Sequence, residues 1–272
     1  MGGSIFLLVI GIWLRRPTPL AELRAAIRRK ELEVYYQPMF NQFTGECVGV
    51  EALLRWRQQD RNWIEPDLFI PIAEDGRLVQ PMTDLLLSAV TEELAPMLKA
   101  NPELHVSLNL YAEEVRTGRV LAELEHTLIA AGVRPRQIWL EVTERSFMDI
   151  ESARITLKQA HDKGYVVAID DFGTGYSSLQ YLQKLPVDVL KVDKSFIVPI
   201  GTGAVSSHII YHIIEMGKSL NLTIVAEGVE TREQADYLAG LGVTLMQGWL
   251  YAPAMSADEI KEFVRRRQAG LE

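Results

Sequence analysis

The sequence predicts an α/β fold in which eight strands and the helices between them close into a TIM-like (β/α)8 barrel. Strand-like apolar runs alternate with helical patterns along most of the chain, which is the order that produces a parallel sheet. The chain has 272 residues, close to the roughly 250 that one such barrel needs. No change of composition and no long linker divides this region, so we expect one barrel domain.

The first two expected strands differ from the others. Only a few residues around Thr44-Gly45 separate them, too few for a parallel crossover, so we expect a hairpin with an antiparallel first strand. The later strands are short apolar runs, typical of strands buried on both faces. The expected strands are 34–39, 47–56, 105–109, 138–142, 166–170, 187–192, 223–227 and 243–247. The expected helices are 20–29, 66–73, 82–99, 120–131, 152–163, 206–220, 233–241 and 257–267.

The N-terminal residues differ in character from the rest. Residues 5–14 are almost wholly apolar and are followed at once by two arginines. The run is shorter than the roughly 20 residues of a membrane span, and it lacks the charged start and cleavage site of a signal peptide. We interpret residues 1–16 as the end of a transmembrane helix that starts outside this chain, and 17–31 as a connecting helix. The barrel domain, 32–268, is then expected on the cytoplasmic side of the inner membrane. We expect a sensor domain upstream, outside this chain, to control it.

Composition excludes several classes of function. The formal net charge of −8 provides no basic face for a nucleic-acid duplex. The single cysteine, Cys47, excludes an internal disulfide framework and any multi-cysteine metal site.

Polar residues stand at the ends of successive strands. In a parallel barrel these ends open on one face, where barrel enzymes place their active sites. Asp170 and Asp171 follow an apolar run, and they can converge on one site only if the strand ends there and the chain turns. Alone, the pair would be a solvated strand end, but so many neighbouring charges would repel each other without a cation. The residues concerned are Glu51, Asn109, Glu141, Asp170, Asp171, Lys191, Glu227 and Gln247.

The candidate ligands are all oxygen donors, which suits Mg²⁺ or Mn²⁺ rather than zinc. The carboxylates outnumber those that one Mg²⁺ uses, so the pattern predicts two divalent metal ions of the kind that act on phosphodiesters. Lys191 would add positive charge near the reacting phosphorus.

Four motifs in this order resemble those of the EAL-domain phosphodiesterases, which open cyclic di-GMP to linear pGpG. The motifs are Glu51-Ala52-Leu53-Leu54-Arg55, Asp170-Asp171-Phe172-Gly173-Thr174-Gly175, Lys191-Val192-Asp193 and Ala226-Glu227-Gly228-Val229-Glu230. Tyr36-Gln37-Pro38 and residues 66–74 are similar as well, and the resemblance covers about residues 20–266.

The resemblance implies a role for each residue. The ligands of one metal would be Glu51, Asn109, Glu141 and Asp170, and those of the second Asp170, Asp171 and Glu227, with Asp170 bridging. Lys191 would orient the hydrolytic water, and Glu227 or Asp171 would accept its proton. The residues that would meet the substrate are Gln37, Arg55 and Gln247, and those that would stabilise loops are Glu144 and Glu230. The resemblance is also compatible with a homodimer formed through the barrel's helices.

The chain departs from the family pattern after Gln247-Gly248. The family usually has an aromatic segment, a basic residue and then proline. Here the segment is Trp249-Leu250-Tyr251-Ala252-Pro253-Ala254, with the proline one position early and no basic residue. The departure affects this loop and contacts to guanine rather than the metal ligands. Tyr251 is a candidate for stacking on a guanine, and simple packing at the barrel rim is its alternative.

Two other functions are compatible with these motifs. A catalytically silent cyclic di-GMP receptor acting through a partner is expected to lack one or more acidic ligands, and none is missing here. A phosphodiesterase with the same site could instead act on another phosphodiester.

Replacing one proposed ligand tests the two-metal hypothesis. We predict that Glu51→Ala or Asp170→Ala abolishes turnover of cyclic di-GMP, because each removes an oxygen ligand that no other residue supplies. The fold should stay largely intact, as circular dichroism would check. Near-normal activity in either variant would contradict the assignment.

Overall fold

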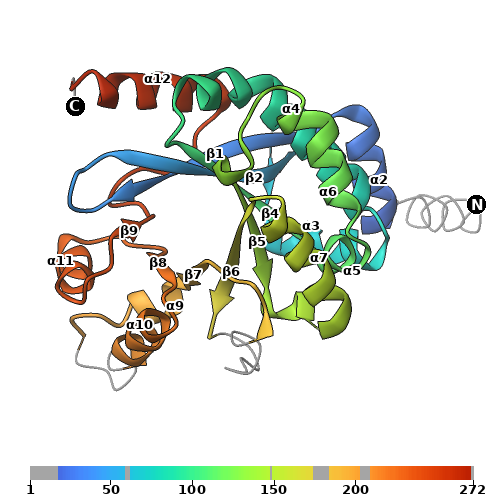
Figure 1. Ribbon diagram of the computed structural model, residues 1–272. Helices are drawn as coiled ribbons and strands as arrows, with labels where there is room; N and C mark the ends of the chain where they lie inside the picture. The colour runs from blue at the N-terminus through green and yellow to red at the C-terminus, as the bar shows by residue number, and fades with distance from the viewer. Residues whose placement is uncertain (1–17, 59–61, 148, 174–183, 203–208, 271–272) are drawn as a thin grey trace, which may run out of the picture. The chain divides into compact units, whose positions relative to one another are not determined.

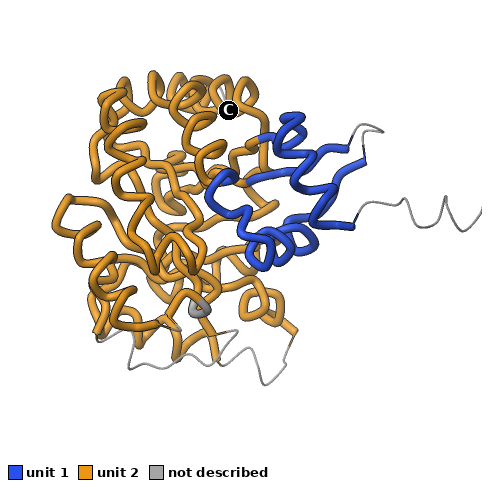
Figure 2. Tube along the Cα trace, turned by 90° about the vertical axis from the view of Figure 1, so that its right-hand side faces the viewer, with its two compact units in different colours: residues 1–33, 54–82 blue, residues 34–53, 83–272 orange. Residues whose placement is uncertain are grey.

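The structure is a computed structural model that divides into two compact units, and each is described by itself (Figure 2). The first unit comprises residues 1–33 and 54–82, and the second comprises 34–53 and 83–272. The residues described are 18–58, 62–147, 149–173, 184–202 and 209–270.

Eight strands of one sheet close into a barrel (Figure 1). Their order is β1-β9-β8-β7-β6-β5-β4-β2, and β2 pairs back with β1. β1 is antiparallel to β9, whereas every pairing from β2–β4 round to β8–β9 is parallel. The predicted barrel with an antiparallel first strand is therefore confirmed. The strands are β1 (Leu32–Asn41), β2 (Cys47–Arg57), β4 (His105–Leu110), β5 (Ile138–Thr143), β6 (Val166–Phe172), β7 (Val189–Val192), β8 (Thr223–Ala226) and β9 (Leu245–Met246).

Helices connect the parallel strands, mostly where the sequence predicts them. The expected helix 120–131 is instead two pieces, α6 (Arg119–Leu124) and a π-helical turn (Glu125–Ile129), and α5 (Ala112–Thr117) is additional. The others are α4 (Val79–Ala100), α7 (Ile150–Asp162), α9 (Lys194–Ile197), α10 (Ile209–Ser219), α11 (Arg232–Gly240) and α12 (Ala257–Gln268). Two 3₁₀ turns, Pro135–Gln137 and Glu144–Phe147, precede and follow β5.

The first unit contains α2 (Pro19–Arg29), β3 (Trp63–Ile64) and α3 (Pro66–Asp75). α2 lies where the connecting helix is predicted. Its Thr18 side chain accepts a hydrogen bond from the Ala21 amide, and proline occupies its first position, as at many helix starts. Trp56 packs edge to face on Phe69, with ring centroids 6.0 Å apart.

None of the helices within the described residues is both long enough and apolar enough to cross a bilayer. The segment 1–16, interpreted above as the end of a membrane helix, lies outside the described residues.

The barrel interior is layered. One buried apolar cluster consists of Met39, Ala168, Val189 and Val225, each from a different part of the closed sheet. Side chains two residues apart on a strand share a face. Two residues after Ala168, Val189 and Val225, toward the carboxyl ends of the parallel strands, are Asp170, Lys191 and Glu227. Two residues before Met39, in antiparallel β1, is Gln37. Strand alternation therefore places a polar layer directly above an apolar one.

Gly49 provides a test of packing inside the barrel. A Cβ at this position would lie 2.1 Å from Nε2 of His105, whose buried ring stacks on Trp139 with centroids 3.7 Å apart. We predict that Gly49→Ala lowers the free energy of unfolding by about 1–3 kcal/mol, because this ring has no room to move. Denaturant titration measures the change.

The matched control is Gly240→Ala at the end of α11, where a new Cβ meets nothing within 4 Å. Its stability should be unchanged or raised by up to about 1 kcal/mol, because alanine has the higher helix propensity. Equal stability of the two alanine variants would contradict the packing described for Gly49.

Candidate active site

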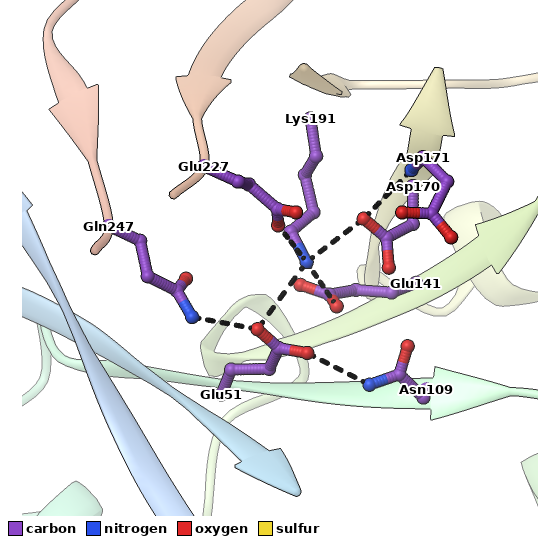
Figure 3. Close-up of polar contacts among 8 residues, drawn as sticks. All are labelled: Glu51, Asn109, Glu141, Asp170, Asp171, Lys191, Glu227 and Gln247. Atoms are coloured by element: carbon purple, nitrogen blue, oxygen red, sulfur yellow. Dashed lines mark hydrogen bonds and ion pairs between the residues drawn. The ribbon is translucent and has the colours of Figure 1, made fainter. Parts of the chain in front are cut away.

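The polar residues predicted at the strand ends come together in the second unit. Figure 3 shows their side chains directed toward a common centre, from β2, β4, β5, β6 and β7 and from the residues that follow β8 and β9. Glu51, Asn109 and Glu141 lie on β2, β4 and β5, whose register places Asn109 opposite Glu141. Glu227 and Gln247 lie one residue beyond β8 and β9, which are shorter than predicted. The strand alternation of the barrel thus brings residues far apart in sequence to one place.

The ammonium group of Lys191 lies at the centre of this cluster. Its distances are 2.6 Å to Glu141 Oε2, 2.6 Å to Glu227 Oε1, 3.2 Å to Asp170 Oδ1 and 3.6 Å to Glu51 Oε2. The contact to Glu141 is a hydrogen bond, whereas the contact to Glu227 is an ion pair without hydrogen-bond geometry. The side chain is completely buried, so this ammonium partly neutralises charges that water does not screen.

Two amides hold Glu51. Asn109 Nδ2 donates to Glu51 Oε1 at 3.0 Å, and Gln247 Nε2 donates to Oε2 at 2.8 Å. Gln247 is predicted to meet the substrate, but its amide nitrogen is engaged with this carboxylate instead. Its Oε1 is buried and accepts no hydrogen bond from any described residue. Gln247 therefore orients a candidate metal ligand.

Asp170 and Asp171 converge by a mechanism that differs from the prediction. β6 does not end at Asp170 but continues to Phe172, and its pairing with β7 shifts register between Ile169 and Phe172. Asp171 adopts a left-handed conformation with φ +53°, which aspartate tolerates better than most residues. A bulge of this kind re-aims side chains within a strand. It turns the Asp171 carboxylate toward the cluster, beside that of Asp170, without a strand end.

The electrostatics show an excess of negative charge. Desolvation raises the pKa of Glu141 to about 8, with further increases from Glu51 and Asp170. Desolvation and the Asp170 carboxylate raise the pKa of Asp171 to about 6 and that of Glu227 well above its ordinary value. These pKa shifts have two causes: burial, which is the larger, and the presence of five carboxylates near one ammonium group.

Glu51 and Lys191 remain charged in this environment. Burial alone would raise the pKa of Glu51, but Lys191 and the hydrogen bonds from the two amides lower it. Burial alone would lower the pKa of Lys191, but the surrounding carboxylates raise it well above its ordinary value.

The donor set fits divalent metal ions. Carboxylate oxygens of Glu51, Glu141 and Asp170 lie within 4.8 Å of one another, as do those of Asp170, Asp171 and Glu227. The two groups share Asp170, in agreement with the predicted ligand sets. Glu141 Oε1 is buried and has no hydrogen-bond partner among the described residues. Oxygen donors that are close, anionic and unsatisfied are what hard cations such as Mg²⁺ prefer.

Two neighbouring residues also shape the site, although the sequence analysis assigned them no role. The Asp193 carboxylate raises the pKa of Asp171 and caps α9 by accepting a hydrogen bond from the Ser195 amide. Phe196 covers Gly173, where φ is +98° and a Cβ would lie 2.6 Å from the ring. Asp193 could have been found from the Asp-x-Ser capping pattern, whereas no sequence signal marks the ring over Gly173.

Gln37, Arg55 and Tyr251 are the other predicted substrate contacts. Gln37 belongs to the polar layer, and its Nε2 donates to the Ala252 carbonyl at 3.4 Å. Arg55 lies on β2 in the first unit, and its Nη1 donates to the Leu54 carbonyl. The Tyr251 ring stacks on Phe40, with centroids 5.1 Å apart. Phe40 follows the inward-facing Met39, so this stack lies on the outer face of β1. The packing alternative therefore describes Tyr251 better than guanine stacking does.

The two residues predicted to stabilise loops have different outcomes. The Glu144 backbone forms part of a 3₁₀ turn, but its side chain lies outside the described structure. The Glu230 side chain is exposed and makes no hydrogen bond or ion pair with a described residue. Its backbone amide is held instead, by a hydrogen bond to Gln234 Oε1 at 2.8 Å. A loop-stabilising role of the Glu230 side chain therefore stays a prediction.

A family model described as "EAL domain" matches residues 20–254. Among curated proteins of Escherichia coli (strain K12), "Probable cyclic di-GMP phosphodiesterase PdeB" is 40% identical over 92% of this chain and 48% of its own length. "Cyclic di-GMP phosphodiesterase PdeL" is 36% identical over 92% of this chain and 69% of its own. The solved structure "PaMucR Phosphodiesterase, c-di-GMP complex" superposes with TM-score 0.83 at 35% identity, covering 89% of this chain and 99% of that chain.

The fold and the site define a (β/α)8 barrel with a candidate metal centre at the carboxyl ends of its strands. Within that class, this chain belongs to the EAL-domain family. The chain spans about half the length of the first curated relatives that it matches.

The raised pKa values of the cluster predict how pH and metal act on stability. The folded metal-free chain keeps protons on Glu141 and Asp171 that the unfolded chain has released, so its stability should fall as pH rises from about 5 to about 8. Metal ions bind the ionised carboxylates, so the increase in Tm caused by Mg²⁺ or Mn²⁺ should grow over the same interval. Thermal unfolding with and without metal measures both effects.

Glu141→Gln should weaken this pH dependence, because it removes the carboxyl group that titrates nearest pH 8. Glu103→Gln alters an exposed carboxylate that pairs with Arg136, and should leave the dependence unchanged. A metal-induced Tm increase that is the same at both pH values would contradict the electrostatic account.

Proposed function

We propose that this chain is a metal-dependent phosphodiesterase that hydrolyses cyclic di-GMP to linear pGpG, using two Mg²⁺ or Mn²⁺ ions. The observation that carries the proposal is the meeting of the predicted ligands at one end of the barrel: five carboxylates form two groups that share Asp170, and Asn109 donates a hydrogen bond to Glu51. The names of the relatives and the complex formed by PaMucR support the choice of substrate. A silent receptor would not need the complete set.

The charge of the site explains why metals are part of the proposal. A phosphodiester is an anion, and five carboxylates near one ammonium group would repel it. Bound metal ions would neutralise this charge, polarise the phosphoryl oxygen and lower the pKa of a bound water.

The chain's own residues have separate roles in this proposal. The buried Lys191 ammonium, held by carboxylates on several sides, orients the attacking water and stabilises charge that develops on phosphorus. Glu227 or Asp171 accepts the proton of that water, since both carboxylates lie in one group with Asp170. Gln37 and Arg55 contact the substrate outside the reacting phosphate.

We also propose that the barrel acts on the cytoplasmic side of the inner membrane. The apolar run 5–14 followed by Arg15-Arg16 supports a membrane tether. A sensor domain upstream of this chain and pairing of two barrels would then control turnover.

Product analysis tests the proposed function. Purified protein with Mg²⁺ or Mn²⁺ and cyclic di-GMP should yield linear pGpG, and EDTA should stop the reaction, because the carboxylates alone repel the substrate. Chromatography of the products makes the measurement. Full recovery of cyclic di-GMP at high enzyme concentration would overturn the proposal, and binding that survives EDTA would favour the receptor. Preferential turnover of another phosphodiester in a substrate panel would identify the third alternative.

A further inference from the structure

We propose that Gln234 is a positioning residue that fixes Glu227 relative to Lys191 by joining the loops after β8 and β7. The inference rests on the proposed function, since it concerns the second carboxylate group. Gln234 lies in the first turn of α11, and its side chain is only 7% exposed. Buried amides in proteins are almost always hydrogen-bonded, so its partners indicate what it does.

The Gln234 amide bonds to two different loops. Its Oε1 accepts hydrogen bonds from the backbone amides of Glu230 at 2.8 Å and Thr231 at 3.0 Å, both in the loop that begins with Glu227. Its Nε2 donates to the carbonyl of Ile197 at 3.4 Å, at the end of α9. α9 follows directly on β7, which carries Lys191. One side chain therefore connects the segments that carry Glu227 and Lys191.

The loop between Glu227 and Gln234 is held tightly against its neighbours. The Glu227 amide donates to the Val192 carbonyl at 3.1 Å, and the Val229 amide donates to the Gln247 carbonyl at 3.0 Å. Gly228 has φ +63°, and a Cβ there would lie 2.4 Å from Cβ of Lys194. Glycine thus allows the loop to touch the first residue of α9. The Gln234–Ile197 hydrogen bond joins the same loop to the last residue of α9.

An ordinary helix cap explains only part of this arrangement. Thr231 and Gln234 form a capping box, in which each side chain bonds the other's backbone amide. The box formed by Ser256 and Glu259 at the start of α12 is exposed, and the hydrogen bonds from Ser256 N and Oγ to Glu259 Oε2 stay within its own helix end. The bond to Ile197 and the burial of Gln234 exceed what capping requires. The additional hydrogen bond indicates that Gln234 also connects the loop after β8 to the segment after β7.

The position of Glu227 depends on this connection. Its Oε1 lies 2.6 Å from Lys191 Nζ, and its carboxylate forms one group with Asp170 and Asp171. The other group, which contains Glu51 and Glu141, is carried by regular strands. Loosening the two loops should therefore weaken metal binding at the Glu227 group and leave the other group unaffected.

Gln234→Glu separates positioning from capping. The glutamate keeps an oxygen acceptor for both loop amides, and its negative charge suits the start of a helix. It cannot donate to the Ile197 carbonyl at neutral pH. We expect Tm to stay within about 2 °C of the wild type. Calorimetric titration with Mn²⁺, without substrate, should show one binding event weakened about 10–100-fold and the other unchanged. Turnover should lose kcat with little change in KM.

Glu259→Gln is the matched control, because it changes one charge in the exposed capping box of α12. Its Mn²⁺ titration and turnover should equal those of the wild type. Gln234→Met removes all three bonds and should weaken the same binding event at least as much. Wild-type Mn²⁺ binding in Gln234→Glu would overturn the proposal, as would a lower Tm without a change in metal binding.

The two proposals fail in different ways. Wild-type protein that binds two Mn²⁺ ions but leaves cyclic di-GMP intact would contradict the proposed function. The titration of Gln234→Glu would still decide the positioning role, because it requires no substrate.

Discussion

The repulsion among carboxylates at one end of the barrel is the constraint on which this site depends. Burying charges of one sign is costly unless opposite charge lies beside them. Lys191 provides that charge at 2.6 Å from two carboxylates, but five carboxylates lie in the two groups around it. Burial, the largest cause, and the neighbouring carboxylates raise the pKa values of Glu141 and Asp171. The remaining negative charge favours a cation. Divalent metal ions would neutralise this charge, which is why the proposed function includes them.

Most of the fold and the meeting of the central carboxylates could be predicted from the sequence, because both depend on local patterns. Apolar runs and their polar ends are short-range features, and parallel strand ends necessarily meet on one face of a barrel. The bulge in β6 could not be predicted in this way. A left-handed aspartate at position 171 is unfavourable by itself and persists because the surrounding structure holds it. The convergence of Asp170 and Asp171 was therefore predicted correctly, but with the wrong backbone cause.

Residues around the ligands were harder to assign because their partners are distant in sequence. Gln247 bonds Glu51, which lies 196 positions away, and Tyr251 stacks on Phe40 from the opposite end of the chain. Glu230 belongs to a motif, yet the buried Gln234 supplies the hydrogen bond that holds its backbone. A motif identifies the segment that forms part of the site, whereas tertiary packing decides which side chain fixes the conformation of that segment.

The two carboxylate groups depend on the fold in different ways. A regular strand directs alternate side chains to the barrel interior, so strands can supply Glu51, Glu141 and Asp170 without any irregularity. Asp171 requires the bulge in β6, and Glu227 lies beyond the end of β8. The geometry of the first group thus follows from the barrel itself. That of the second group follows from loops, so changes in loop conformation can alter it while the barrel remains folded.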